Sequence, residues 1–361
     1  MGESLEPSGG AARASAEADA PQAPSKRARI LKRTVFGSGL ALACAGVVWL
    51  AHAIGEPTPL LIMASLIALI GLIEVSLMGT LVMRALPVIL ILPLVGVTML
   101  EFAFLERHPA EPWAQLALEF LFAGSLAMLV HDLTRGLARR TLARQITILA
   151  VSAAIVGAFA WLDSRNESPL DALPVFLGFA ALAVLVSVLR NRTPAKRLDV
   201  AISFGLAVWI AVPMPALAHV DRLWGTRGLV SLILLSKIGD VVGYYVGNAI
   251  GKTHPFPTLS PGKTTAGCVG SLAGGIALGA ALAWLEILPP GTWGVAGGAA
   301  IGGLTNLASQ AGDLCESWVK RRARVKDSST WLGPSGGVLD VVDSLLFSVP
   351  CALVVWPLLL A

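Results

Sequence analysis

Cysteine and charge are both scarce in this sequence. Its four cysteines, Cys44, Cys268, Cys315 and Cys351, lie in or beside apolar segments and show no CxxC spacing. A disulfide framework or a zinc site is therefore not expected. Charged residues make up only 14% of the 361 residues, and a few loops carry most of the net charge of +4. This balance gives no support to nucleic-acid binding and fits an anionic headgroup or a nucleotide better.

Long apolar runs dominate the chain instead. Hydrophobic residues make up 55% of the sequence, and the mean hydropathy is +0.74. Stretches of roughly 20 apolar residues recur, which is the length that a helix needs to cross about 30 Å of hydrocarbon. The expected spans are 35–54, 58–78, 85–105, 114–131, 146–162, 171–189, 199–218, 227–250, 268–288, 293–314 and 343–361. We therefore expect an all-α, polytopic integral membrane bundle of about 9 to 11 transmembrane helices.

Basic residues gather in loops that fall on one side of this bundle. They are Lys26, Arg27, Arg29, Lys32 and Arg33, then Arg135, Arg139, Arg140 and Arg144, then Arg190, Arg192, Lys196 and Arg197, and finally Lys320, Arg321, Arg322, Arg324 and Lys326. Positive charges near span ends favour the cytoplasmic side, so the N-terminus is predicted to be cytoplasmic. Residues 1–30 are expected to form a disordered tail. The apolar run that begins near Val35 is interpreted as a retained first span rather than as a signal peptide.

The character of the spans changes at about residue 225. Residues 31–224 are expected to form transmembrane scaffold helices with almost no polar groups in mid-span, and residues 225–361 a catalytic transmembrane region. Glycines recur in the second part, where small residues let helices approach closely. They are Gly270, Gly274, Gly275, Gly279, Gly298, Gly302 and Gly303. We interpret them as helix-packing residues and assign none of them to a ligand.

A first polar group lies in the segment SKIGDVVGYYVG. Ser236, Lys237, Asp240 and Tyr244 are spaced to share one face of a helix. Lys237 and Asp240 could neutralise each other inside the bundle, or the face could line a polar cavity that is open to the cytoplasm. The sequence leaves both interpretations open.

The loop that follows contains two GKT triplets, at 251–253 and 262–264. A Walker A loop is excluded, because the glycine required five positions earlier is Val246 in one case and Pro257 in the other. The loop is nevertheless rich in donors that could hold phosphate oxygens: Lys252, His254, Ser260, Lys263, Thr264 and Thr265. A solvated linker is the alternative interpretation.

A second polar group surrounds the last basic run. Asp313, Glu316, Ser317 and Lys320 share one helical face, and Asp340 and Asp343 are three residues apart. Carboxylates in this pattern suit Mg²⁺, and nearby Lys and Arg complement phosphate charge. A positive-inside stop after a helix would explain the basic residues alone, but not the three aspartates. The combination favours phosphoryl or nucleotidyl transfer.

These residues resemble the signature of the phosphatidate cytidylyltransferases, or CDP-diacylglycerol synthases, which runs S-x-x-K-R-x4-K-D and then H-G-G-x-x-D-R-x-D. The matching positions are Ser317, Lys320, Arg321, Lys326, Asp327, Gly336, Gly337, Asp340 and Asp343. GDLCES at 312–317 and the segment 237–267 are also similar to family blocks. The resemblance is specific over about residues 225 to 350. Two positions depart from it, because the family histidine is Ser335 and the arginine of D-R-x-D is Val341.

The resemblance implies transfer of CMP from CTP to phosphatidic acid, which gives CDP-diacylglycerol and pyrophosphate for phospholipid biosynthesis. It implies Mg²⁺, at one ion or at a two-ion site, held by Asp313, Asp340 and Asp343, with Lys320 and Lys326 as further catalytic residues. The implied substrate-binding residues are Ser260, Lys263, Thr264, Arg321, Lys237, Asp240, Gly336 and Gly337. The expected partners are CTP, phosphatidic acid and membrane lipids, without nucleic acid and with a homodimer as one candidate assembly. We expect the active site to face the cytoplasm at the bacterial inner membrane.

Three alternatives stay open at the level of sequence. A CTP-dependent kinase of a polyprenol or phytol would use a similar charged face but transfer the γ-phosphate. A transporter with a Lys237–Asp240 relay would predict paired interrupted helices in two repeated halves, and no internal repeat is evident. A non-catalytic, lipid-binding homologue is suggested by the departures at Ser335 and Val341.

Overall fold

The fold is built from helices throughout the part of the chain that can be described. A computed structural model describes residues 26–78, 93–101, 112–134, 169–190, 204–289, 291–333 and 336–360, with short pieces at 154–155, 157–158, 193 and 201. Every regular element in these ranges is helical, and none is a strand. The all-α prediction is therefore confirmed. Residues 1–25 of the tail predicted at 1–30 lie outside the described residues, as do most of the predicted spans 85–105 and 146–162 and the basic residues between 135 and 144 and at 192, 196 and 197. Residues 26–30 are helical, so the prediction of a disordered tail is wrong for these five residues.

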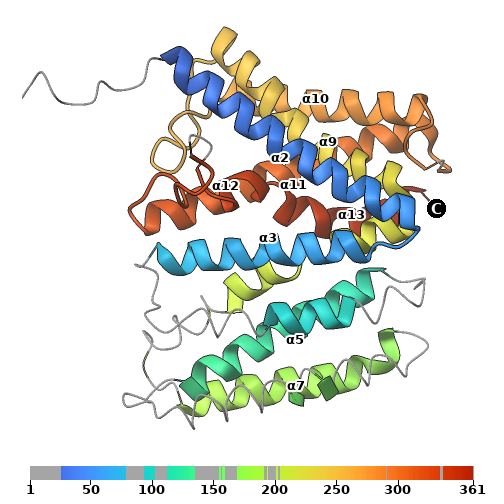
Figure 1. The fold of residues 1–361 in the computed structure, drawn as a ribbon, viewed down its shortest axis with the longest axis vertical. Coiled ribbons are helices and arrows are strands. Elements are labelled where there is room, and N and C mark those ends of the chain that lie inside the picture. Colours follow the sequence, from blue (N-terminus) through green and yellow to red (C-terminus); the bar gives the residue numbers. More distant parts are fainter. Residues whose placement is uncertain are drawn as a thin grey trace, which may run out of the picture.

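In the described residues, the N-terminal part contributes four long helices to the bundle. These are α2 (Lys26–Ile54), α3 (Thr58–Leu77), α5 (Pro112–Thr134) and α7 (Pro169–Arg190). A shorter helix occupies residues 93–101. Figure 1 shows α3, α5 and α7 one after another in the lower half of the molecule. The predicted spans 58–78, 114–131 and 171–189 coincide with three of these helices within a few residues.

The C-terminal part forms a second, glycine-rich group. It consists of α9 (Leu217–Ile250), α10 (Thr265–Trp284), α11 (Gly294–Arg322), the single turn α12 (Leu339–Val342) and α13 (Leu345–Leu360). Helix α11 packs against α9, α10 and α13, so it is the centre of this group (Figure 1). The loop predicted between spans 199–218 and 227–250 is reduced to one non-helical residue inside α9, Gly225, whose φ is 67°.

Six helices of the described residues are long and apolar enough to cross a membrane. They contain the segments Thr58–Val75, Pro112–Val130, Asp171–Leu189, Leu217–Ile250, Thr265–Trp284 and Leu339–Leu360. Helix α11, which contains the predicted span 293–314, is not among them, because glycine and polar residues lower its hydropathy. The chain is thus a polytopic membrane protein, and the expected count of about 9 to 11 spans stays a prediction.

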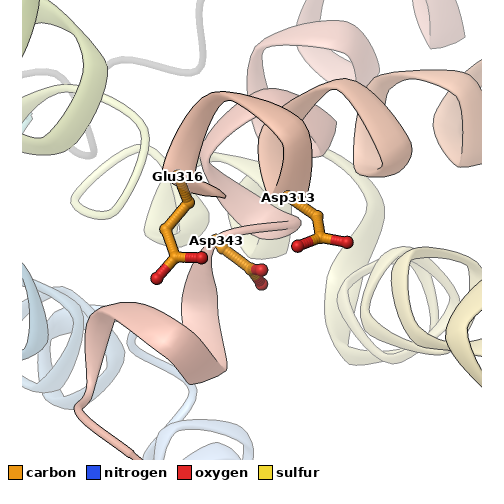
Figure 2. A group of neighbouring side chains, drawn as sticks. All are labelled: Asp313, Glu316 and Asp343. Carbon is orange, nitrogen blue, oxygen red and sulfur yellow. The ribbon is translucent and has the colours of Figure 1, made fainter. Parts of the chain in front are cut away.

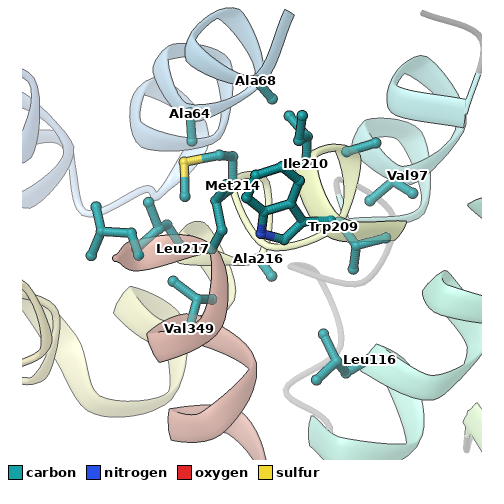
Figure 3. Close-up of a cluster of buried hydrophobic side chains, with 14 of the residues drawn as sticks. Ala64, Ala68, Val97, Leu116, Trp209, Ile210, Met214, Ala216, Leu217 and Val349 are labelled. Carbon is teal, nitrogen blue, oxygen red and sulfur yellow. The ribbon is translucent and has the colours of Figure 1, made fainter. Parts of the chain in front are cut away.

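A buried core joins the two groups at a π-helical turn, η1 (Ala207–Ala211). Trp209 and Ile210 lie among small and branched side chains from several helices, and Figure 3 shows this cluster. Its labelled members are Ala64, Ala68, Val97, Leu116, Trp209, Ile210, Met214, Ala216, Leu217 and Val349. Lipid tails are as apolar as these side chains, so close packing rather than water exclusion stabilises the cluster. The core holds α3 beside the C-terminal group.

Glycines bring α10 and α11 into backbone contact. A Cβ atom on Gly279 would lie 2.2 Å from the carbonyl oxygen of Gly298, and one on Gly302 would lie 2.1 Å from that of Gly275. Real Cβ atoms essentially never come this close to another heavy atom. The interpretation of these four glycines as packing residues is therefore confirmed.

Candidate active site

Three carboxylates from two elements converge below α11. Asp313 and Glu316 are one turn apart on α11, and Asp343 caps the C-terminal end of α12. Each offers one oxygen, and these oxygens all lie within 4.8 Å of one another. Figure 2 shows the Asp343 carboxylate between those of Glu316 and Asp313. The structure thus brings together Asp313 and Asp343, which are 30 positions apart in the sequence.

The close approach of Asp343 depends on Gly312. A Cβ atom on Gly312 would lie 2.4 Å from the backbone oxygen of Asp343. Any larger residue would push the α12–α13 junction away from α11. The glycine of the GDLCES block therefore has a direct steric role beside the carboxylates.

The donor set of this group fits a hard divalent cation. Glu316 is only 1% exposed and Asp343 only 7% exposed, so both carboxylates are removed from bulk water. Oxygen Oε1 of Glu316 is buried and accepts no hydrogen bond from the described residues. Burial raises the pKa of Glu316, which lies beyond the predicted end of its span, to about 9. A bound cation would stabilise the ionised form of such a buried carboxyl group, and Mg²⁺ prefers carboxylate oxygens.

Three lysines from three different elements surround the carboxylates. Lys263, just before α10, lies 2.5 Å from Asp313 Oδ2, and Lys320 on α11 lies 2.6 Å from Glu316 Oε2. Lys237 on α9 lies 3.6 Å from Asp343 Oδ1 and donates a hydrogen bond of 2.7 Å to the Val341 carbonyl. Each lysine is thus paired with a different acid. The cluster combines anionic and cationic groups, as a site for phosphate and metal requires.

Asp340 adjoins the three-carboxylate group but is not a member of it. Its Oδ1 contacts Lys320 Nζ at 2.6 Å. Its Oδ2 accepts hydrogen bonds from Ser328 N at 2.9 Å and Gly337 N at 2.6 Å, and it lies 2.8 Å from Ser328 Oγ. Although the sequence suggested Asp340 as a metal ligand, these donors occupy both of its oxygens. The contacts favour a role in ordering the loop and in holding Lys320 beside Glu316.

A cavity of about 470 Å³ adjoins the carboxylates. Helices α9, α10 and α11 and the loop before α10 line it, through residues that include Asp240, Tyr244, Asn248, Lys263, Thr264 and Gln310. Lys263 lines this cavity and also reaches Asp313, so the cavity and the carboxylate group are contiguous. Asp240 belongs to the cavity, and the ion pair of Lys237 is made with Asp343. This arrangement favours the polar-cavity interpretation of the first polar group.

The loop before α10 has an ordered conformation of its own. Thr264 is the N-cap of α10, and its Oγ1 accepts a hydrogen bond of 3.0 Å from Gly267 N. Lys263 N donates to the Ser260 carbonyl at 3.1 Å, which closes a turn ahead of the cap. Arg321 ties this loop to the end of α11 by donating to the Leu259 carbonyl at 3.3 Å.

The remaining predicted residues lie at the edge of the site. Arg321 and Lys326 are both exposed at or after the end of α11. Ser335 lies outside the described residues. Val341, in place of the family arginine, packs its side chain against the core and offers only its carbonyl oxygen to Lys237. The substrate-binding roles predicted for Ser260, Thr264 and Arg321 and the catalytic role of Lys326 stay predictions.

Sequence analysis missed Glu74, a fully buried acid in α3. Its carboxylate accepts four hydrogen bonds from the loop that leads to α12. The expectation of almost no polar groups in the N-terminal spans is therefore wrong at this position. A signal was available, because Glu74 is the single acidic residue of an otherwise apolar run, LIALIGLIEVSL, and such residues tend to be functional.

Comparisons with known proteins agree with this arrangement. The sequence profile of the Cytidylyltransferase family matches residues 31–359. Similar proteins include the phosphatidate cytidylyltransferase of Brucella abortus biovar 1 (strain 9-941), which is 40% identical over 126 residues, or 35% of this chain. The phosphatidate cytidylyltransferase of Chlamydia trachomatis serovar D is 29% identical over 220 residues, which cover 56% of this chain and 70% of the relative. The phosphatidate cytidylyltransferase of Aquifex aeolicus (strain VF5) is 30% identical over 185 residues, which cover 51% of this chain and 68% of the relative.

The extent of these matches differs between relatives. The chain spans about 45% of the length of the Brucella relatives that it matches.

Proposed function

The chain belongs to the cytidylyltransferase family, and we propose on this basis that it transfers CMP from CTP to phosphatidic acid, giving CDP-diacylglycerol and pyrophosphate. The observation that carries the proposal is the group of Asp313, Glu316 and Asp343, with a lysine beside each acid and a cavity next to them. The names of the relatives supply the substrates.

The chemistry needs no nucleophile from the protein. A phosphate oxygen of the lipid attacks the α-phosphorus of CTP, and the bond between that phosphorus and the pyrophosphate oxygen breaks. Negative charge on the transferring group must be stabilised by fixed positive groups. Lys263, which lines the cavity, would contribute there, and Lys320 and Lys237, which pair with the acids, would contribute at the carboxylates.

The carboxylate group would hold Mg²⁺ through Asp313, Glu316 and Asp343. The ion would supply Lewis acidity toward phosphate oxygens when bound. Glu316 thereby joins the ligand set that the sequence suggested, and Asp340 orders Lys320 and the loop. The two-ion site with Asp340 as a ligand stays a prediction.

The substrates can be assigned to places by their polarity. The cavity lined by Asp240, Lys263 and Thr264 has the size and the donors for a nucleotide, whereas a diacyl lipid can keep its chains in the bilayer beside the helices. The basic run after α11 supports a cytoplasmic orientation of this end in a bacterial inner membrane. Labelling of Lys326→Cys by a membrane-impermeant maleimide from the cytoplasmic side alone would support this orientation. The homodimer considered from the sequence stays a prediction, for which light scattering on the purified protein is the measurement.

One assay tests the proposed function. Purified protein is given phosphatidic acid, CTP and Mg²⁺, and CDP-lipid and pyrophosphate are measured, with dCTP, ATP and a polyprenol as controls. Equal amounts of CDP-diacylglycerol and pyrophosphate are expected. Release of CDP together with a phosphorylated polyprenol would instead identify the kinase alternative. If no combination of nucleotide and lipid gave a product, the non-catalytic homologue would be favoured.

A further inference from the structure

We propose that Glu74 is a positioning residue, which holds the loop and helical turn that carry Asp340 and Asp343 in the arrangement needed for catalysis. Glu74 lies in α3, whereas every site residue discussed above lies between 237 and 343. The inference rests on the proposed function for its kinetic test, but its structural test is independent of that function.

The Glu74 carboxylate is saturated by donors from the segment 328–339. Its Oε1 accepts from Ser329 Oγ at 2.7 Å and from Val338 N at 2.8 Å. Its Oε2 accepts from Ser328 Oγ at 2.9 Å and from Leu339 N at 2.8 Å. The residue is 0% exposed. A buried carboxylate held in this way fixes both ends of the loop, since its donors come from the start and from the end of the segment.

The same loop residues connect Glu74 to the carboxylate group. The Ser328 hydroxyl donates to Glu74 and the Ser328 backbone N–H donates to Asp340. Asp340 pairs with Lys320, which in turn pairs with Glu316. Leu339, whose amide Glu74 accepts, is the first residue of the turn that ends at Asp343. A shift of this turn would therefore move Asp343 relative to Asp313 and Glu316.

Glu74 also accounts for the second glycine of the Gly-Gly pair. A Cβ atom on Gly337 would lie 1.9 Å from Ser328 Oγ, 2.5 Å from Glu74 Oε1 and 2.6 Å from Glu74 Oε2. The segment can wrap around the carboxylate only if this position has no side chain. Gly336 beside it has a φ of 87°, which disfavours any other residue.

A side chain with two accepting oxygens is the group that fits this set of donors. A carboxylate accepts on both oxygens, whereas glutamine accepts on one atom and donates from the other. One backbone N–H points at each oxygen of Glu74, so Glu74→Gln would place its amide N–H₂ against Val338 N or Leu339 N in either orientation. The substitution keeps the size of the side chain but places a hydrogen-bond donor opposite a backbone N–H that needs an acceptor.

The structural test is limited trypsin digestion of the detergent-purified protein. Arg324 and Lys326 are exposed cleavage sites immediately before the segment that Glu74 holds. We expect Glu74→Gln to be cut at these two sites at least about tenfold faster than wild type, as followed by mass spectrometry of the fragments. The matched control is Glu56→Gln, an exposed acid in the turn before α3, which should be cut at the wild-type rate.

The kinetic test separates positioning from general destabilisation. Glu74→Gln should raise the Mg²⁺ concentration that gives half-maximal turnover and lower kcat, each by roughly tenfold or more. A loss of global stability alone would reduce the active fraction and leave the Mg²⁺ requirement unchanged. Ser329→Ala, which removes one of the four donors, should fold normally and give a smaller change in the same direction.

The outcomes are distinct. Wild-type rates of loop cleavage and a wild-type Mg²⁺ requirement in folded Glu74→Gln and Ser329→Ala would overturn the proposal. Failure of the wild-type protein to form CDP-lipid would count against the proposed function, and the trypsin comparison would still decide whether Glu74 holds the loop.

Discussion

At the scale of single residues, the site depends on acids and lysines that hold one another in place. An isolated aspartate in mid-membrane costs about 2.5 to 3.5 kcal/mol on insertion scales. Here each acid of the three-carboxylate group has a lysine within 4 Å, from Lys237, Lys263 or Lys320. The pairing leaves at least one carboxylate oxygen, Oε1 of Glu316, without a hydrogen-bond partner in the described residues. Under the proposed function, a cation and a phosphate would both find partners there.

The role of Gly312 gives a prediction at this scale. Gly312→Ala would place a methyl group where the Asp343 backbone now lies, so the α12–α13 junction must move away from α11. We expect CTP-dependent pyrophosphate release to fall at least about tenfold, because the carboxylates separate. The control is Gly178→Ala in α7, where an added Cβ meets no atom within 4 Å. Equal turnover of Gly312→Ala and wild type would show that the close approach is not required.

The identity of most site residues could be predicted from the sequence, but their partners could not. Helical spacing placed Asp313 and Glu316 on one face, and an aspartate pair three residues apart marked Asp340 and Asp343. Spacing cannot tell which member of that pair faces Glu316, because this depends on the path of the preceding loop. The partners of Glu74 could not be predicted for the same reason, since its donors lie more than 250 positions away.

At the scale of elements, α11 is the helix around which the site is arranged. It presents Asp313, Glu316 and Lys320 on one face, and its glycine face packs against α10, which follows the loop that contains Lys263. The positions of Lys263 and Asp313 are thus fixed by the same helix–helix contact. Disturbing the glycine contact should affect stability before it affects chemistry.

Gly279 is the position at which this can be measured. Gly279→Ala would bring its methyl group within 2.2 Å of the Gly298 carbonyl, so α10 and α11 must separate. Overpacking of this kind costs about 1–3 kcal/mol, and the apparent Tm of the detergent-purified protein should fall. Gly178→Ala again serves as the control and should leave Tm within error of wild type. A Tm for Gly279→Ala equal to that of the control would argue against backbone contact between the two helices.

Helix positions could be predicted from apolar runs, and helix ends could not. The predicted span 293–314 is contained in α11, but this helix continues through the basic run to Arg322 because polarity does not end a helix. The last span was predicted to begin at 343, but the helical turn α12 already begins at Leu339. Glu74 accepts a hydrogen bond from the backbone N–H of Leu339, and hydropathy cannot reveal this contact. The join between the predicted spans at 218 and 227 is a single glycine with positive φ, which hydropathy cannot reveal.

At the scale of the whole molecule, the described N-terminal and C-terminal helices share one buried core. The core around Trp209 and Ile210 joins α3, α5, α9 and α13, and Glu74 extends this connection to the site. All described elements that contribute to the site meet at the end of α11 that leads into the basic run. Under the proposed function, a water-soluble nucleotide and a lipid would reach the same group of residues from different phases.

Cation binding by the purified chain tests the central claim most directly. Mn²⁺, which also prefers carboxylate oxygens, can be titrated in the absence of substrates and followed by the loss of its free-ion EPR signal. We predict that wild type binds Mn²⁺, and that Asp343→Asn binds it at least about tenfold more weakly and releases no pyrophosphate from CTP, while staying folded. Asp171→Asn, at an exposed position in the first turn of α7, should match wild type. Wild-type affinity for Mn²⁺ together with near-normal turnover in Asp343→Asn would contradict the account.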